Sequence, residues 1–304
     1  MLKIIILVAV IMLSLFLLFS LFMTYYLGKI IYDTPPRFAP SKDAVYEEVK
    51  NLLGYCMDQY ESWEKEFFTV SNGEHVIHAE IHPIKQARGI AILAHGFGQN
   101  RYIMVPFAEI LRKQGFATVI FDQRAFGEST GERGTFGEKE GEDTAKLIEW
   151  ARNRYGNNVK IILCGASMGA ISVLNSQLYT DPVNAIIEDS SPDYVKDVIK
   201  PFYKSLIHLP NPFIGYVIKM GIKKGVDITC NNPIEAAKRI DVPILIMHGE
   251  ADRTVPIQMG KNIMSVLINP KSRMEIFAGC DHTLEIVEFN RYYHVVKDFL
   301  DEVF

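Results

Sequence analysis

The chain has 304 residues, a formal net charge of −4 and 48% hydrophobic residues, a composition typical of a globular protein with a substantial core. The mild acidity and the lack of a basic run argue against a nucleic-acid-binding surface, so we expect no nucleic-acid partner. The sequence has no C-x-x-C pair and no Cys/His cluster at metal spacing, which argues against a zinc site. Cys164 lies in an apolar run and is expected to be a packed thiol, whereas a disulfide among Cys56, Cys230 and Cys280 is left open.

The first feature along the chain is an uncharged apolar run over residues 4–27. It is long enough to span the hydrocarbon core of a bilayer, and it ends with tyrosines of the kind that sit at a membrane interface. A cleaved signal peptide and a buried soluble helix are the alternatives. A signal peptide usually has a shorter apolar region and a small-residue cleavage site, which the stretch MTYYLGK does not offer. We therefore expect a transmembrane anchor over residues 1–28.

The orientation of this anchor is poorly determined by charge. The flanking charges are Lys3 before the run and, after it, Lys29, Asp33, Arg37, Lys42 and Asp43. These charges are close to balanced by the positive-inside rule. The segment is similar to a signal-anchor, which favours a single-pass membrane protein with an extracytoplasmic catalytic domain.

Residues 29–64 are expected to form a connector that begins with the breaker clusters at 34–36 and 40–41. Apolar residues at helical intervals then predict a helix over residues 44–60. From residue 65, EKEFFTV, the turn signal Asn72-Gly73 and EHVIHAEIHPI predict an antiparallel hairpin with alternating faces.

Six apolar, β-branched runs follow, and stretches with helical periodicity separate most of them. They read GIAILAH, FATVIFD, VKIILCG, AIIED, PILIMHG and RMEIFAG. Continuous apolar strands that alternate with helices are typical of a parallel sheet covered on both faces. The sequence therefore predicts an α/β domain over residues 65–304, with a mostly parallel sheet opened by an antiparallel hairpin.

One interval interrupts this rhythm and predicts a helical cap insertion over about residues 191–240. It reads as short helices broken by Pro210, Pro212 and Gly225. An insertion after a strand lies above the carboxyl edge of the sheet, where ligands bind in such folds. Residues 191–236 carry six lysines against four acids. This excess fits either a solvated surface or a patch that faces an anionic bilayer.

The stretch Gly165-Ala166-Ser167-Met168-Gly169 is a G-x-S-x-G pattern between an apolar strand and a helical segment. A strand, a sharp turn and a helix form the context that this pattern needs to expose a nucleophilic serine. The glycines allow strand and helix to approach closely. We therefore predict Ser167 as the catalytic nucleophile, with an idle serine in a tight turn as the alternative.

A serine hydroxyl needs a base and an orienting acid. His282 follows the last predicted strand and is the preferred base, with a helix-capping histidine as the alternative. Asp252 lies just beyond the penultimate strand and is the preferred acid, while Glu250 and Asp281 are alternatives. The chain order of Ser167, Asp252 and His282 is the order expected of one serine-hydrolase fold.

The developing oxyanion needs backbone donors. The run His95-Gly96-Phe97-Gly98 follows a strand and precedes a helix, so the Phe97 N–H is one predicted donor. The Met168 N–H, directly after the nucleophile, is the other. His95 is expected to shape this turn and not to act as a base.

The same glycine run mimics a dinucleotide fingerprint, with Asp122 as the later acid. Arg101, however, stands where a third small residue must allow close packing, and the match does not fall in the first βα unit. The oxidoreductase interpretation is therefore set aside.

Taken together, these motifs resemble the α/β-hydrolase superfamily, and most of all its serine-aminopeptidase-like and monoacylglycerol-lipase-like branch with a helical cap. The resemblance covers residues 65–304 and rests on GASMG, HGFG, the loop DQRAFG at 122–127, HGEADRTVP and GCDHT. The family often has Gly-His where this chain has Ala125-Phe126, a departure on a structural loop that weakens the transfer of any named substrate.

The resemblance and the residues together imply a membrane-tethered serine hydrolase that cleaves carboxylic esters through an acyl-serine, with no metal or cofactor. The substrate is expected to be a small-molecule acyl ester, for which lipid-derived chains would suit the apolar residues of the insertion: Phe202, Leu206, Ile207, Leu209, Phe213, Ile214, Tyr216 and Val217. The alternative is that these residues only pack the cap. An aminopeptidase or amidase with the same triad, and a non-catalytic membrane-anchored binding module, are the alternative functions.

Overall fold

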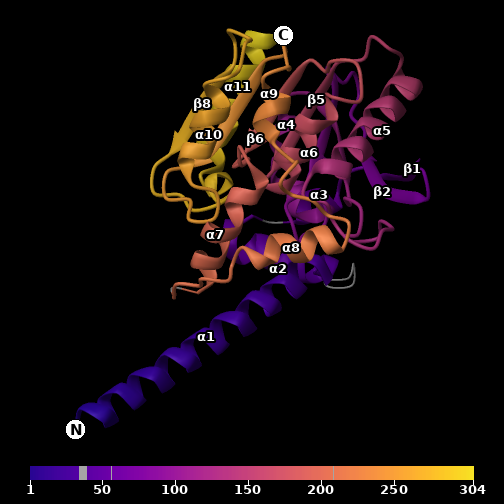
Figure 1. The fold of residues 1–304 in the computed structure, drawn as a ribbon. Coiled ribbons are helices and arrows are strands. Elements are labelled where there is room, and N and C mark those ends of the chain that lie inside the picture. Colours follow the sequence, from indigo (N-terminus) through magenta and orange to yellow (C-terminus); the bar gives the residue numbers. More distant parts are fainter. Residues whose placement is uncertain (34–39, 56, 208) are drawn as a thin grey trace.

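A computed structural model describes residues 1–33, 40–55, 57–207 and 209–304 of the chain. The breaker cluster at 34–36, Arg37 and Cys56 lie outside the described residues. The described part is an eight-stranded sheet between helices, with a long helix projecting from one side (Figure 1).

The sheet has the strand order β1-β2-β4-β3-β5-β6-β7-β8. Its strands are β1 (Glu66–Asn72), β2 (His75–His82), β3 (Gly89–Ala94), β4 (Phe116–Phe121), β5 (Ile161–Ala166), β6 (Ala185–Asp189), β7 (Ile244–Gly249) and β8 (Arg273–Phe277). Strand β2 is antiparallel to β1 and β4, and every pairing from β4 to β8 is parallel. The predicted fold, a hairpin followed by a parallel sheet, is confirmed.

Helices cover both faces of the sheet because the central strands are apolar on both sides. One face carries α4 (Val105–Lys113) and α11 (Phe289–Val303), and the other carries α5 (Glu138–Tyr155), α6 (Met168–Ser176), α9 (Pro233–Ala237) and α10 (Ile257–Met264). The short helices η2 (Arg101–Met104) and η3 (Glu285–Val287) precede α4 and α11.

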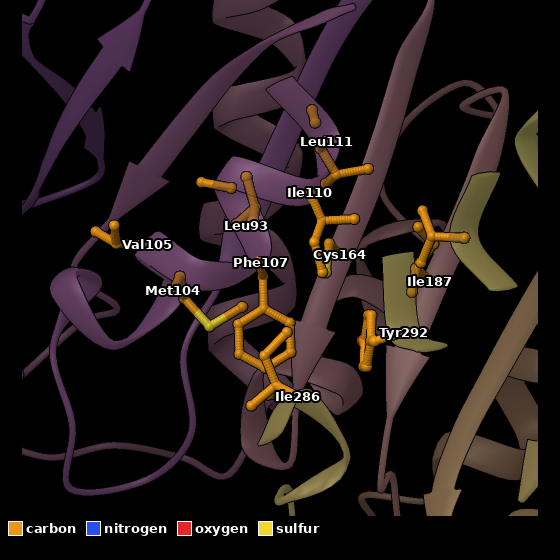
Figure 2. Packing of buried hydrophobic residues seen from close by; sticks show 14 of the residues in the cluster. Leu93, Met104, Val105, Phe107, Ile110, Leu111, Cys164, Ile187, Ile286 and Tyr292 are labelled. Carbon is orange, nitrogen blue, oxygen red and sulfur yellow. The ribbon is translucent and has the colours of Figure 1, made fainter. Parts of the chain in front are cut away.

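The core on the α4 and α11 face is closely packed. Figure 2 shows Phe107 of α4 lying next to Ile286 and Tyr292, with Cys164 on the strand beside them. The rings of Phe107 and Tyr292 meet edge to face with centroids 5.6 Å apart, a favoured aromatic geometry. This layer fixes the position of the segment between β8 and α11, which carries His282.

A third apolar cluster lies outside the sheet and joins the N-terminal helix to the insertion after β6. Helix α1 (Leu2–Asp33) contributes its carboxyl end, and α7 (Val195–Leu206) and α8 (Tyr216–Lys223) supply the other side. Figure 1 shows α2, α7 and α8 gathered where α1 leaves the domain. Among the described residues, one helix, α1, is long and apolar enough to cross a membrane.

Two expectations about the early segments were wrong in detail. The helix expected over residues 44–60 is split into α2 (Lys42–Leu53) and α3 (Asp58–Glu61). Gly54 ends α2 with φ +62°, a left-handed conformation that terminates helices and favours glycine. The faces of β1 alternate, but β2 is buried on both faces over residues 79–82, where it lies between β1 and β4.

The loop after β4 is held by two buried ion pairs. The carboxylate of Asp122 accepts hydrogen bonds from the backbone and the guanidinium of Arg101. The Arg124 guanidinium donates two hydrogen bonds to the Asp143 carboxylate, at 2.6 and 2.7 Å. This pairing ties the loop to α5, next to the carboxyl edge of the sheet.

We predict that Asp143→Asn destabilises the protein by about 3 kcal/mol, because it leaves the Arg124 guanidinium buried without its counter-ion. The exposed Asp181 provides the control, and Asp181→Asn is expected to change stability by less than about 0.5 kcal/mol. Urea unfolding of the detergent-solubilised protein measures both. Equal unfolding midpoints for the two variants would contradict the prediction.

Candidate active site

Ser167 lies at the turn between β5 and α6 in a backbone conformation that is strained for any residue except glycine. Its φ and ψ are +54° and −117°, and its N–H donates to the Asp189 carbonyl at 2.8 Å. A Cβ on Gly165 would lie 2.3 Å from the Gly169 carbonyl oxygen, and one on Gly169 would lie 2.0 Å from the Ala94 oxygen. Only glycines at these two positions therefore allow the turn that presents the serine.

The structure brings Ser167, His282 and Asp252 into one hydrogen-bonded chain. Asp252 Oδ2 lies 2.7 Å from His282 Nδ1, and His282 Nε2 lies 2.9 Å from Ser167 Oγ. A carboxylate only accepts, so Nδ1–H donates to Asp252, and Nε2 is left to accept from the serine hydroxyl. This is the tautomer in which the imidazole takes a proton from the serine.

Asp252 is fixed by backbone donors on the loop that follows β7. Its Oδ1 accepts hydrogen bonds from the N–H groups of Thr254 and Val255, at 2.8 and 2.7 Å. The neighbouring His248 donates from Nε2 to the Val255 carbonyl at 2.9 Å, and burial lowers the pKa of this histidine. The second carboxylate oxygen of Asp252 is thus free to orient His282.

The two alternative acids lie elsewhere. Glu250 is exposed. The Asp281 carboxylate accepts from the backbone of Arg253 and His282, at 3.0 and 2.9 Å, and pairs with the Arg253 guanidinium. Asp281 therefore holds the His282 loop against the Asp252 loop and does not contact the imidazole nitrogens.

The run after β3 lies beside the serine, as expected of an oxyanion loop. A Cβ on Gly96 would lie 3.5 Å from the Ser167 Cβ, and Phe97 and Met168 line the same cavity as Ser167. His95 is fully buried and uses both ring nitrogens, with Nδ1 2.7 Å from the Gly96 carbonyl and Nε2 accepting from the Gln123 N–H at 3.0 Å. Its burial lowers its pKa, and it shapes the turn.

Ser167 and His282 open into a cavity of about 360 Å³, within the usual range for small-molecule sites. Most of its lining is apolar. Helices α1 and α2 supply Ile31 and Leu52, the cap helix α7 supplies Val195, Val198, Ile199 and Phe202, and Phe97, Ile103, Met104, Phe107, Phe136 and Ile171 complete most of the apolar wall. Such a wall is able to accommodate a hydrocarbon chain next to the Ser167 hydroxyl.

The source of this lining differs from the expectation. Of the eight insertion residues predicted to suit an acyl chain, Phe202 is the one that lines the cavity. Leu206, Leu209 and Tyr216 are exposed, whereas Ile214 and Val217 pack into the third cluster. Ile31 and Leu52 come from the first 64 residues, where no sequence motif pointed to the site. The apolar run Ile30-Ile31-Tyr32 after Lys29 was the available signal.

Three buried carboxyl groups lie behind the serine and histidine loops. Burial raises the pKa of Glu188 to about 8. Burial, together with the charge of Glu285, raises the pKa of Asp189 well above its usual range. Burial also raises the pKa of Glu285. Tyr292 donates a hydrogen bond to the Asp189 carboxyl at 3.2 Å. Burial therefore favours the neutral form of all three acids beneath the site.

None of the groups of three or more His, Cys, Asp or Glu side chains within the described ranges is arranged to hold an ion. Cys164, Cys230 and Cys280 are free thiols.

Sequence comparison identifies relatives over the central part of the chain. The model of the serine aminopeptidase S33 family matches residues 85–217, which include Ser167 but neither Asp252 nor His282. The human protein ABHD12B is 27% identical over 233 residues, which are 72% of this chain and 62% of that protein. The lysophosphatidylserine lipase ABHD12 of Macaca fascicularis is 28% identical over 181 residues, 55% of this chain and 42% of the relative. The matched region thus spans less than two thirds of either relative.

Structural comparison extends the likeness to most of the chain. An esterase from Pyrococcus furiosus superposes with a TM-score of 0.67 at 22% sequence identity, covering 83% of this chain and 97% of the esterase. At this identity the likeness shows a shared fold, and it confirms the α/β-hydrolase architecture expected from the sequence.

The buried Glu188 gives a prediction for the pH dependence of stability. Its folded pKa of about 8 lies above that of the unfolded chain, so its protonated form stabilises the folded state fully below about pH 4.5. This contribution is lost as the pH rises towards 8, at up to about 1.4 kcal/mol per pH unit. We expect the stability of the wild type relative to Glu188→Gln to fall over this range.

Urea unfolding of both proteins at pH 5, 6, 7 and 8 measures the difference. Glu132, which is 89% exposed at its side chain, provides the control Glu132→Gln. A wild-type advantage that stays constant from pH 5 to 8 would show that Glu188 does not change its protonation on unfolding.

Proposed function

We propose that the chain is a serine hydrolase of the α/β-hydrolase superfamily, with Ser167 as nucleophile, which the family match and the shared fold support. His282 is the general base and Asp252 is the orienting acid. The observation that carries the proposal is the hydrogen-bonded chain from Asp252 through His282 to Ser167, at the end of an apolar cavity. The presence of both hydrogen bonds that link Asp252, His282 and Ser167 also argues against a non-catalytic binding module.

The reaction follows from this geometry. Ser167 Oγ attacks the substrate carbonyl carbon while His282 Nε2 takes the hydroxyl proton. The N–H groups of Phe97 and Met168 stabilise the oxyanion. Collapse of the tetrahedral intermediate then breaks the ester C–O bond, and His282 returns the proton to the leaving alcohol. Water, deprotonated by His282, then attacks the acyl-serine, which releases the carboxylic acid and restores the Ser167 hydroxyl.

The proposed substrate is a carboxylic ester with an apolar acyl group of the kind found in lipids. The lining of the cavity supports this class, since its walls are mostly apolar. A relative named as a lysophosphatidylserine lipase supports it further. An aminopeptidase is the second candidate, because the Glu48 carboxylate also lines the cavity and is able to bind a substrate ammonium group. Gln99 donates a hydrogen bond to Glu48 at 3.1 Å.

Labelling by a fluorophosphonate probe tests the enzyme. We expect the wild type to be labelled and Ser167→Ala to lose the label completely. Asp252→Asn should react about 10³–10⁴-fold more slowly, because the imidazole loses its required tautomer. Ser71→Ala, which changes an exposed serine on β1, is the control that should be labelled like the wild type. Equal labelling of the wild type and Ser167→Ala would refute the proposal.

A substrate panel separates the two candidate activities. Aryl esters of graded chain length are compared with aryl amides of amino acids. An esterase is expected to give kcat/KM values that rise with acyl length, while preference for the amides, lost in Glu48→Gln, would establish the aminopeptidase.

We also infer that α1 is retained as a membrane anchor. Residues 2–19 project from the domain and are mostly exposed. At 1.5 Å per residue they span about 27 Å, close to the hydrocarbon thickness of a bilayer. The rest of the helix packs on the cap, with Ser20, Thr24, Leu27 and Gly28 buried. A signal peptide that is removed would not need these contacts.

Sequencing of the mature N-terminus tests the anchor, and a start before residue 4 is expected. A mature protein that starts near residue 30 would show that α1 is removed and is not a retained anchor. The proposed extracytoplasmic side is tested on the same protein in sealed membrane vesicles. Protease added outside right-side-out vesicles should degrade the catalytic domain, whereas protection until the vesicles are opened would reverse the orientation.

A further inference from the structure

The carboxyl end of α1 is built into the cap by close contact with α8. A Cβ on Gly221 would lie 2.5 Å from the ring of Tyr32, and one on Gly28 would lie 2.5 Å from the Met220 side chain. Each helix thus places a glycine opposite a large residue of the other. Tyr32 is 1% exposed, so its ring is fully enclosed by this contact.

Polar contacts extend the same interface along α1. Asn211, in the loop before α8, donates to the Ser20 carbonyl at 3.1 Å and to the Thr24 hydroxyl at 2.9 Å. At the other end, Lys224 forms an ion pair with Asp33. These contacts cover more than three turns of the helix and hold it in one position against the cap.

In this fixed position, the carboxyl end of α1 reaches the active site. Ile31 lines the cavity that holds Ser167 and belongs to the same apolar cluster as Ile171 and Ile199. Ile171 lies one turn after Ser167 on α6. The carboxyl end of α1 therefore forms part of the apolar wall, next to α6, the helix that begins after the nucleophile.

An aromatic path joins α1 to the predicted oxyanion loop. The ring of Tyr32 meets that of Phe136 edge to face, with centroids 6.1 Å apart. Phe136 in turn stacks on Phe97, with centroids 5.1 Å apart and an interplanar angle of 6°. Phe136 and Phe97 both line the cavity.

We propose that the carboxyl end of the N-terminal helix is a wall of the acyl-binding site, with Ile31 as a residue that determines acyl-chain specificity. The inference rests on the proposed ester hydrolysis at Ser167. It assigns to the anchor a second role: the helix that holds the protein in the membrane also contacts the acyl chain of the substrate. A chain packed between α7 and the opposite wall touches Ile31, so the size of this side chain sets the length and bulk that the cavity accepts.

The test uses the full-length protein in detergent micelles and two opposite changes at one position. The readout is the ratio of kcat/KM for a dodecanoyl aryl ester to kcat/KM for the acetyl ester. Ile31→Trp fills the cavity and is expected to lower this ratio at least about tenfold, while Ile31→Ala should raise the ratio or move the optimum to bulkier acyl groups. A general folding defect cannot shift the ratio in both directions.

A matched variant controls for changes to the anchor itself. Leu18 lies on the same helix, is 63% exposed and is far from the cavity, so Leu18→Trp should keep the wild-type ratio. Equal ratios in the wild type, Ile31→Trp and Ile31→Ala would refute the inference while leaving the hydrolase intact. A wild type that hydrolyses no ester and takes no label at Ser167 would instead refute the proposed function.

A second pair of variants tests the contact that positions α1. Gly221→Ala places a methyl group against the Tyr32 ring and is expected to shift the ratio in the same assay. Gly215→Ala, at a glycine with no atom within 4 Å of the added Cβ, should not. Identical ratios for the two glycine variants would show that the packing of α1 on α8 does not control the acyl wall.

Discussion

The close approach of α6 to β3 and β5 is the constraint on which the site depends. Gly165 and Gly169 remove the two side chains that would separate the helix from the sheet. The chain therefore turns sharply at Ser167 and accepts a strained φ of +54° there. That strain is of the order of 1–3 kcal/mol and is balanced by the packing of the two elements. It fixes the serine hydroxyl above the carboxyl edge, towards which the loops after β3, β7 and β8 converge.

The buried polar groups around this turn form hydrogen bonds with one another. Gln123 accepts the Ser172 hydroxyl hydrogen bond at 2.5 Å and donates to the His95 carbonyl, so α6, β3 and β4 share one buried network. Arg101, the residue that argued against a nucleotide site, closes the same region through its ion pair with Asp122. The loop that carries Phe97 is thus anchored at both ends, which suits the proposed role of the Phe97 N–H as a preorganised oxyanion donor.

The sequence predicted the strands, the turn at Ser167 and the partners of the serine because each depends on local chemistry. Apolar runs, glycines at fixed offsets and an acid and a histidine just past later strands are visible without coordinates. The origin of the apolar cavity wall was not visible in the same way. Ile31 and Leu52 reach the cavity through packing between distant segments, and no spacing along the chain encodes that. The end of α2 at Gly54 was likewise missed. Apolar residues continue at helical intervals past Gly54, although the left-handed conformation of this glycine ends the helix.

The same packing links α1 to the electrostatics of the site. With α1 on one side and the sheet on the other, the cavity is enclosed mostly by apolar groups, and the acids beneath it are buried. Burial raises the pKa of Asp189 and of Glu285, which favours the neutral form of each carboxyl group. The carboxylate that faces the His282 ring is that of Asp252, whose Oδ1 accepts hydrogen bonds from two backbone N–H groups. In the proposed mechanism, the imidazolium that forms at His282 meets one oriented negative charge in a medium of low polarity, where that charge acts most strongly. In the proposed role of membrane anchor, α1 would contribute to the chemistry as well as to the location of the protein, because its carboxyl end helps to exclude water from this cavity.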